Sequence, residues 1–206
     1  MSFGRAQFTA LMLSAVGAIA ALADDTPPVA DPPAGQLLIA SAEIQDPRFA
    51  RSVILLLRHD SSGALGIIIN HPLGKRPLAA VLSQTDSKES QDSPVEGTIP
   101  VFLGGPVQPQ LGFVIHGADY RRPETLVVGD QLAMTASLQV LRDIGHHQGP
   151  AKYLFALGYA GWGAGQLEGE IANHGWFIAP AEPDLVFDAE RDMVWDKAFA
   201  RRTREM

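Results

Sequence analysis

The feature that most constrains the fold of this chain is a series of short apolar runs, in place of long helical periods. Residues 36–41 (QLLIAS), 52–57 (SVILLL) and 64–70 (ALGIIIN) are rich in Ile, Leu and Val. Runs of this length and composition are typical of strands. The turn-forming residues 60–63 (DSSG) predict a hairpin between the last two runs. Because the runs do not alternate strictly with polar residues, we expect both faces of these strands to be buried.

Further strands and short helices follow along the chain. Pro and Gly positions and apolar spacing predict helices at residues 77–82, 137–144 and 166–173. The remaining apolar runs predict strands at residues 101–103, 112–116, 126–128, 153–157 and 176–178. Strands come first and then mingle with helices, without a regular βαβ repeat. This order favours an α+β fold with a mixed or antiparallel sheet.

A final helix is predicted near the C-terminus. Asp188 is a residue type that caps helix N-termini. Beyond it, helical spacing places apolar residues on one face, namely Val194, Trp195, Ala198 and Phe199. We expect this helix to pack against the body through that face.

The N-terminus has the pattern of a secretory signal. Arg5 precedes a run of apolar and small residues that ends at Ala21-Leu22-Ala23, a small-x-small cleavage site. We expect residues 1–23 to be a signal peptide cleaved after Ala23. The product would be periplasmic or secreted, with no stable membrane insertion after cleavage. Residues 24–35 (DDTPPVADPPAG) predict a disordered Pro-rich leader, and residues 36–206 a single globular domain.

Composition excludes several classes of function. The chain has no Cys, which removes disulfides, thiol catalysis, Cys-ligated zinc and iron–sulfur clusters. The formal net charge of −7 comes without a basic stripe, so we predict no nucleic acid partner. No residue pattern indicates a cofactor. The partner is expected to be an unidentified protein or small molecule.

Four segments together carry a family resemblance. They are residues 36–49, from Gln36-Leu37-Leu38-Ile39-Ala40 to Asp46 and Phe49; residues 59–72, from His59 through Gly63-Ala64-Leu65-Gly66 to Asn70-His71-Pro72; Gly104-Gly105-Pro106-Val107; and residues 158–171 (GYAGWGAGQLEGEI). In this order and spacing, the chain resembles the YqgE/AlgH family over about residues 36–199. Residues 162–171 are the most specific part of the match.

The resemblance implies one α+β domain whose bifurcated sheet folds into a pseudo-barrel with short helices around it. It implies no established reaction, although members are often labelled transcriptional regulators. This chain departs from the family pattern in its signal and leader, and in His71, which stands where Arg is more usual. An exported member would not meet DNA, which argues against direct transcriptional regulation.

The candidate ligand-binding residues are polar, glycine or aromatic residues at turns and before the predicted 166–173 helix: Asn70, Gly104, Gly105, Trp162, Gly165, Gln166 and Glu168. Backbone N–H groups of the glycine-rich segment 161–166 could face an anion, as helix N-termini do. The alternative is that these glycines allow tight turning and close packing. We predict no catalytic residue and no metal site.

Two functions remain open from the sequence. The first is a non-enzymatic binding or regulatory domain, favoured because no complete catalytic constellation is present. The alternative is a hydrolase or metal-dependent enzyme with a site near His59, Glu168, Glu170 and His174. A Ser–His–Asp set drawn from Ser52, His59 and Asp46 lacks a nucleophile elbow.

Overall fold

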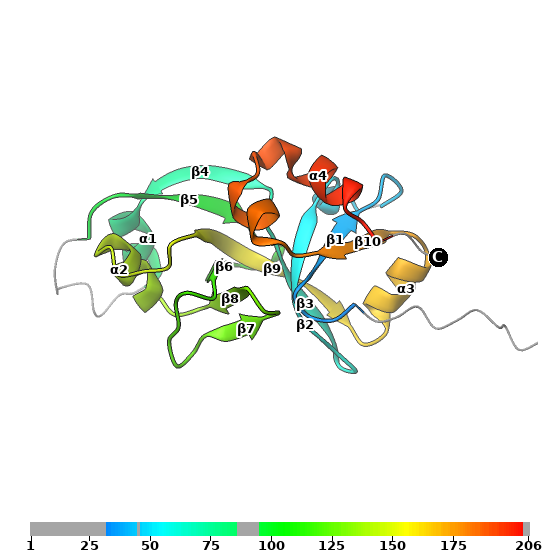
Figure 1. Cartoon of the computed structure of the whole chain (residues 1–206), viewed down its shortest axis with the longest axis horizontal. Helices are drawn as coiled ribbons and strands as arrows, with labels where there is room; N and C mark the ends of the chain where they lie inside the picture. The colour runs from blue at the N-terminus through cyan, green and yellow to red at the C-terminus, as the bar shows by residue number, and fades with distance from the viewer. Residues whose placement is uncertain (1–31, 45, 86–94, 204–206) are drawn as a thin grey trace, which may run out of the picture.

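The computed structural model describes residues 32–44, 46–85 and 95–203, and within them ten strands form one sheet (Figure 1). The strands are β1 Gln36–Ala40, β2 Val53–Asp60, β3 Gly63–Ile68, β4 Pro72–Pro77, β5 Thr98–Leu103, β6 Val107–Gly117, β7 Leu126–Val128, β8 Leu132–Thr135, β9 Tyr153–Gly163 and β10 Trp176–Pro180. The helices are α1 Leu78–Thr85, α2 Gln139–Gly145, α3 Gln166–Ala172 and α4 Val194–Ala200, with short turns η1 Pro47–Phe49, η2 Asp184–Asp188 and η3 Arg191–Met193.

Strand β9 is where the sheet divides. Its last residues pair with β3, and the order from there is β3-β2-β1-β10, antiparallel throughout. Its first residues lie between β6, which is antiparallel to it, and β5, which is parallel to it. Strands β8 and β7 extend the sheet beyond β6, and β4 pairs only with β5. The expected α+β fold with a bifurcated mixed sheet is confirmed, and the curled sheet forms a half-barrel.

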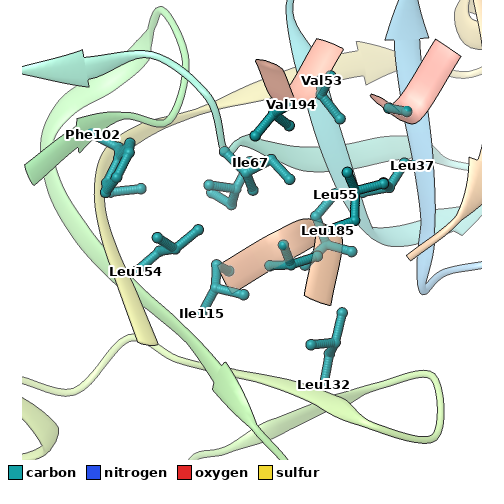
Figure 2. Packing of buried hydrophobic residues seen from close by; sticks show 14 of the residues in the cluster. Leu37, Val53, Leu55, Ile67, Phe102, Ile115, Leu132, Leu154, Leu185 and Val194 are labelled. Atoms are coloured by element: carbon teal, nitrogen blue, oxygen red, sulfur yellow. The ribbon is translucent and has the colours of Figure 1, made fainter. Parts of the chain in front are cut away.

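Both faces of β1, β2 and β3 are buried, as the unbroken apolar runs predicted. On β1, Leu37 and Ile39 belong to the core inside the half-barrel, whereas Leu38 and Ala40 belong to a second cluster on the opposite face. The inner core is closed by Leu185 of η2 and Val194 of α4 (Figure 2). A third cluster lies under α1 and α2, at the far end of the molecule from α3 (Figure 1).

Sequence patterns missed or misplaced some elements. Strand β4 was not predicted, because all six of its residues are exposed and its Pro and Gly residues are usually strand breakers. Strand β9 runs on to Gly163, through glycines that were expected to lie in a turn before α3. The predicted cap at Asp188 is wrong: α4 begins at Val194, and Asp188 instead ends η2 and pairs with Lys152 at 2.5 Å. Leu185 and Val186 of η2 are buried, so this segment packs against the core and α4 begins only after it.

The described chain begins within the predicted leader. Pro32 is buried, and the Gly35 N–H donates to Leu56 O at 2.8 Å, so residues 32–35 lie against the body. The predicted signal peptide and residues 24–31 lie outside the described residues. Among the residues that the structure describes, no helix has the length and apolar character needed to cross a membrane.

The contact of Gly105 with β9 generates a stability prediction. A Cβ at Gly105 would lie 2.1 Å from the Tyr159 carbonyl carbon and 2.4 Å from the Ala160 nitrogen, both of them backbone atoms. We expect Gly105→Ala to lower the free energy of unfolding by about 3 kcal/mol or more, measured by urea denaturation. Gly169→Ala is the control, since a Cβ there meets nothing within 4 Å. Equal stability of the two variants would contradict this packing.

Candidate functional site

A cleft of about 700 Å³ lies beside α3. One wall is formed by Glu43, Ile44, Asp46, Arg48 and Phe49. Another is Pro106 and Val107 at the start of β6, and the third is α3 with the residues flanking it. These walls come from three separate parts of the chain. They meet because β9 carries its last residues past β3 and into α3.

Aromatic side chains form the deep side of the cleft. The rings of Trp162 and Trp176 meet edge to face with centroids 5.8 Å apart, and Phe49 meets Trp176 edge to face at 5.7 Å. Both indoles are almost fully buried, at 7% and 2% exposure. They belong to the cluster that joins α3 to β1–β3. The floor of the cleft is therefore part of the hydrophobic core and holds a fixed shape.

Glu170 is held rigidly in the wall by three side-chain donors. Its Oε2 accepts hydrogen bonds from Trp162 Nε1 at 2.9 Å and from Trp176 Nε1 at 2.7 Å. Its Oε1 accepts from Gln166 Nε2 at 2.9 Å, and Gln166 Oε1 in turn accepts from the Gly163 N–H. A carboxylate has about four acceptor positions, so at least one remains for a further donor.

The charges around the cleft are mostly acidic. Arg48 donates from Nε and Nη2 to the carboxylate of Asp46, with the shortest contact at 2.6 Å. These side-chain hydrogen bonds hold the pKa of Asp46 below its usual range. Because Asp46 and Arg48 offset each other, Glu43 and Glu170 leave the cleft with negative charge.

Three of the predicted ligand-binding residues, Trp162, Gly165 and Gln166, line this cleft. Gly104 and Gly105 lie outside it, against the backbone of β9 at Gly158 and Tyr159. Asn70 also lies elsewhere and ties two backbone segments together: its Oδ1 accepts from Val53 N, and its Nδ2 donates to Arg51 O, both at 2.9 Å.

Glu168 does not line the cleft but pairs with His59. Its Oε1 lies 3.0 Å from His59 Nε2. The N–H of Glu168 itself and the hydrogen bond from His59 hold the pKa of this carboxyl below its usual range. Residues two apart on a helix point about 200° apart, so Glu168 and Glu170 face different neighbours.

The four residues of the enzyme alternative are not gathered into one site. Glu170 is bound to the indoles, His59 and Glu168 form a separate pair, and His174 is exposed in a left-handed turn beyond the end of α3. Within residues 32–44, 46–85 and 95–203, no group of three or more His, Cys, Asp or Glu side chains could hold a metal ion.

Neither the anion hypothesis nor the Ser–His–Asp hypothesis finds its geometry. For the anion hypothesis, residues 161–163 belong to strand β9, where they pair with β3, and the Gly163 N–H already donates to Gln166. Ser52 is fully buried, and its Oγ lies 3.4 Å from Nε2 of His71, not of His59. Burial lowers the pKa of His71.

The sequence did not reveal the wall formed by residues 43–44 and 46–49 or the shared acceptor at Glu170. The Asp46-Pro47 turn and the position of Glu170 between two Trp residues were visible. However, nothing in their spacing shows that a strand end, a helix and a loop would meet there.

The double acceptor at Glu170 generates a prediction. Glu170→Ala removes the acceptor of two buried indole N–H groups, and each lost partner costs about 1–3 kcal/mol. We expect a loss of about 2–4 kcal/mol in the free energy of unfolding, measured by urea denaturation. Glu170→Gln keeps an oxygen for the indoles and should lose less. Glu43→Ala, at an exposed position on the same cleft, should change stability by no more than about 0.5 kcal/mol. A Glu170→Ala variant as stable as Glu43→Ala would contradict the role given to these bonds.

Comparisons with known proteins agree with this fold. The family model described as AlgH-like matches residues 37–206. A UPF0301 protein of Sphingopyxis alaskensis is 44% identical over 166 residues, which cover 81% of this chain and 87% of the relative. A UPF0301 protein of Jannaschia sp. is 45% identical and covers 80% of this chain and 85% of its own length.

Two solved structures share the architecture. The solution structure of the AlgH protein from Pseudomonas aeruginosa is 40% identical, with a TM-score of 0.70 over 81% of this chain and 87% of that one. A crystal structure of a Corynebacterium diphtheriae protein, 23% identical, covers 84% of this chain and 88% of its own with a TM-score of 0.66, and shows the same fold. The resemblance seen in the sequence is confirmed, and the chain belongs to the AlgH-like family.

Proposed function

We propose that this protein is a non-enzymatic binding or regulatory domain that holds its ligand in the cleft beside α3. The observation that carries the proposal is the fixed carboxylate of Glu170 on an aromatic floor. A cleft of about 700 Å³ falls within the range of small-molecule sites, which combine apolar walls with a few well-placed polar groups. Glu170 supplies such a group, already oriented before any ligand arrives.

Gly169 supports the same proposal. It lies inside α3, where Gly is about 1 kcal/mol less favourable than Ala. A Cβ at this position would meet nothing within 4 Å, so packing within the protein does not require a glycine. Gly169 lines the cleft and is exposed. An occupant that approaches the α3 backbone closely would explain why a glycine stands there.

The chemistry of the cleft favours a ligand with N–H donors or a positive charge on an apolar or aromatic body. The acceptor position left on Glu170 can take an N–H donor, and Glu43 adds a second negative charge at the rim. The floor offers indole and phenyl edges to an apolar group. An anionic ligand would meet the two carboxylates and be disfavoured.

The three Trp indoles make a test possible without a known ligand. We would record ¹H–¹⁵N spectra of the intact protein against a fragment set containing arylguanidines and benzylamines, with benzoates as the anionic counterpart. Cationic fragments should shift the indole signals of Trp162 and Trp176. Trp195 lies in α4, and its Nε1 donates to Ala40 O. Its indole signal is the internal control and should not shift.

Gly169→Ala should weaken the binding of such a fragment several-fold, while raising the free energy of unfolding by about 0.5–1 kcal/mol. This separation distinguishes a ligand contact from a folding defect. If no fragment moves Trp162 or Trp176 selectively, or if Gly169→Ala binds as well as the unchanged protein, the cleft is not the binding site.

We also propose that the protein works outside the cytoplasm, on the strength of the signal pattern at residues 1–23. The test is the intact mass of the protein recovered from separate cell fractions of a Gram-negative bacterium that produces it. We expect a periplasmic or secreted species that begins at Asp24. A full-length species confined to the cytoplasm would contradict export.

A further inference from the structure

We propose that His59 is a proton-controlled latch: as an imidazolium it fastens Pro32 to α3, and it releases Pro32 when it loses a proton. The observation is that both ring nitrogens face oxygen atoms. His59 Nδ1 lies 3.0 Å from the carbonyl oxygen of Pro32, and Nε2 lies 3.0 Å from Oε1 of Glu168.

The number of protons on the ring decides whether both contacts are favourable. A carbonyl oxygen and a carboxylate oxygen can only accept hydrogen bonds. A neutral imidazole carries one N–H and can therefore donate to only one of them, leaving a lone pair facing the other oxygen. An imidazolium donates to both at once. Both distances lie within the range of N–H···O hydrogen bonds.

The surroundings favour the charged ring. The His59 side chain is only 4% exposed, so its charge needs a nearby opposite charge, and Glu168 of α3 provides it. Asp60, the next residue of β2, is a second carboxylate that interacts with His59, and it is itself 3.7 Å from Arg58. Neither Pro32 nor Ala64 has a charged side chain; Ala64 is the residue of β3 that pairs with His59.

These charges set the direction in which pH acts on the latch. The pKa of Glu168 is held below its usual range, so its carboxylate persists in mildly acidic solution and is lost only when the pH falls through that lowered value. At the alkaline end, the latch opens when the ring loses its second proton. Pro32 is therefore fastened while the ring carries both protons, mildly acidic solution included, and is released when the pH rises far enough to remove one of them.

The latch controls a short segment and not the strand beside it. The Gly35 N–H stays bonded to Leu56 O, and Gly35 packs on the backbone of Gly129, so β1 keeps its place when the ring changes charge. What changes is the attachment of residues 32–34, the described end of the predicted leader. The attachment of residues 32–34 to the body would thus respond to the pH around it.

The first test is the protonation of the ring. Long-range ¹H–¹⁵N spectra of the full-length protein distinguish protonated from unprotonated imidazole nitrogens. The chain has six His, and the signals absent from His59→Gln identify His59. We expect both nitrogens to be protonated at pH 7. One unprotonated nitrogen at pH 7 would overturn the latch.

The second test follows the segment itself. Because the chain has no Cys, Ala34→Cys gives a unique position for a nitroxide spin label, and Ala34 is exposed. We expect an immobile label from about pH 5 to pH 7 and a mobile one by about pH 9. In Glu168→Gln a neutral ring can donate from Nδ1 to Pro32 and accept at Nε2 from the new amide N–H, so the label should stay immobile at about pH 9.

His174→Asn is the matched control, since it changes an exposed His just beyond the same helix and its left-handed backbone suits Asn. The spin label at position 34 should show the same change of mobility with pH in this variant as in the otherwise unchanged protein. A label equally immobile at pH 7 and pH 9 in the unchanged protein, or a Glu168→Gln variant whose label still becomes mobile at pH 9, would overturn the proposal. Because Glu168→Gln and His59→Gln each remove the imidazolium–carboxylate pair, both should abolish the change of label mobility with pH, and failure of one variant to fold leaves the other as the test.

Discussion

The structure depends on β9, the strand that both branches of the sheet share. Its first half lies between β5 and β6, and its last residues pair with β3, so one continuous backbone holds the two branches together. Gly104 and Gly105 make this possible, because any side chain there would collide with the β9 backbone. The strand then leads directly into α3 and so places the cleft.

Glu170 links this architecture to the proposed site. A charged side chain on a short helix would ordinarily point into solvent, but two indole N–H groups from β9 and β10 hold it against the core. Burial removes the indole N–H groups of both Trp side chains from water, and the same bonds replace the hydrogen bonds to water that are lost. Stability and pre-orientation of the cleft therefore come from one set of contacts.

Helix α3 contributes side chains both to the cleft and to the contact with His59, because successive residues of a helix point in different directions. Leu167 and Ile171 enter the core, Gly165, Gly169 and Glu170 border the cleft, and Glu168 meets His59. The latch and the cleft thus share a helix of seven residues without sharing a side chain. Changes at Glu168 and at Glu170 can accordingly be interpreted separately, one through the N-terminal segment and the other through the ligand.

The sequence by itself determined the strands of the buried sheet, the α+β class, the family and the positions of helices α1, α2 and α3, because apolar runs and helical spacing are local signals that burial enforces. It also indicated Trp162, Gly165 and Gln166, which line the cleft. It misplaced the start of α4 and missed β4, where exposed Pro and Gly residues hide a strand that exists only through its pairing with β5. Only the tertiary structure decided that Glu170 would meet two indoles and that His59 would face both Pro32 and Glu168. It also decided that residues 43–44 and 46–49 would form a wall of the cleft. No helix or strand periodicity in the sequence predicts these contacts. They form only when the sheet curls and brings the segments together.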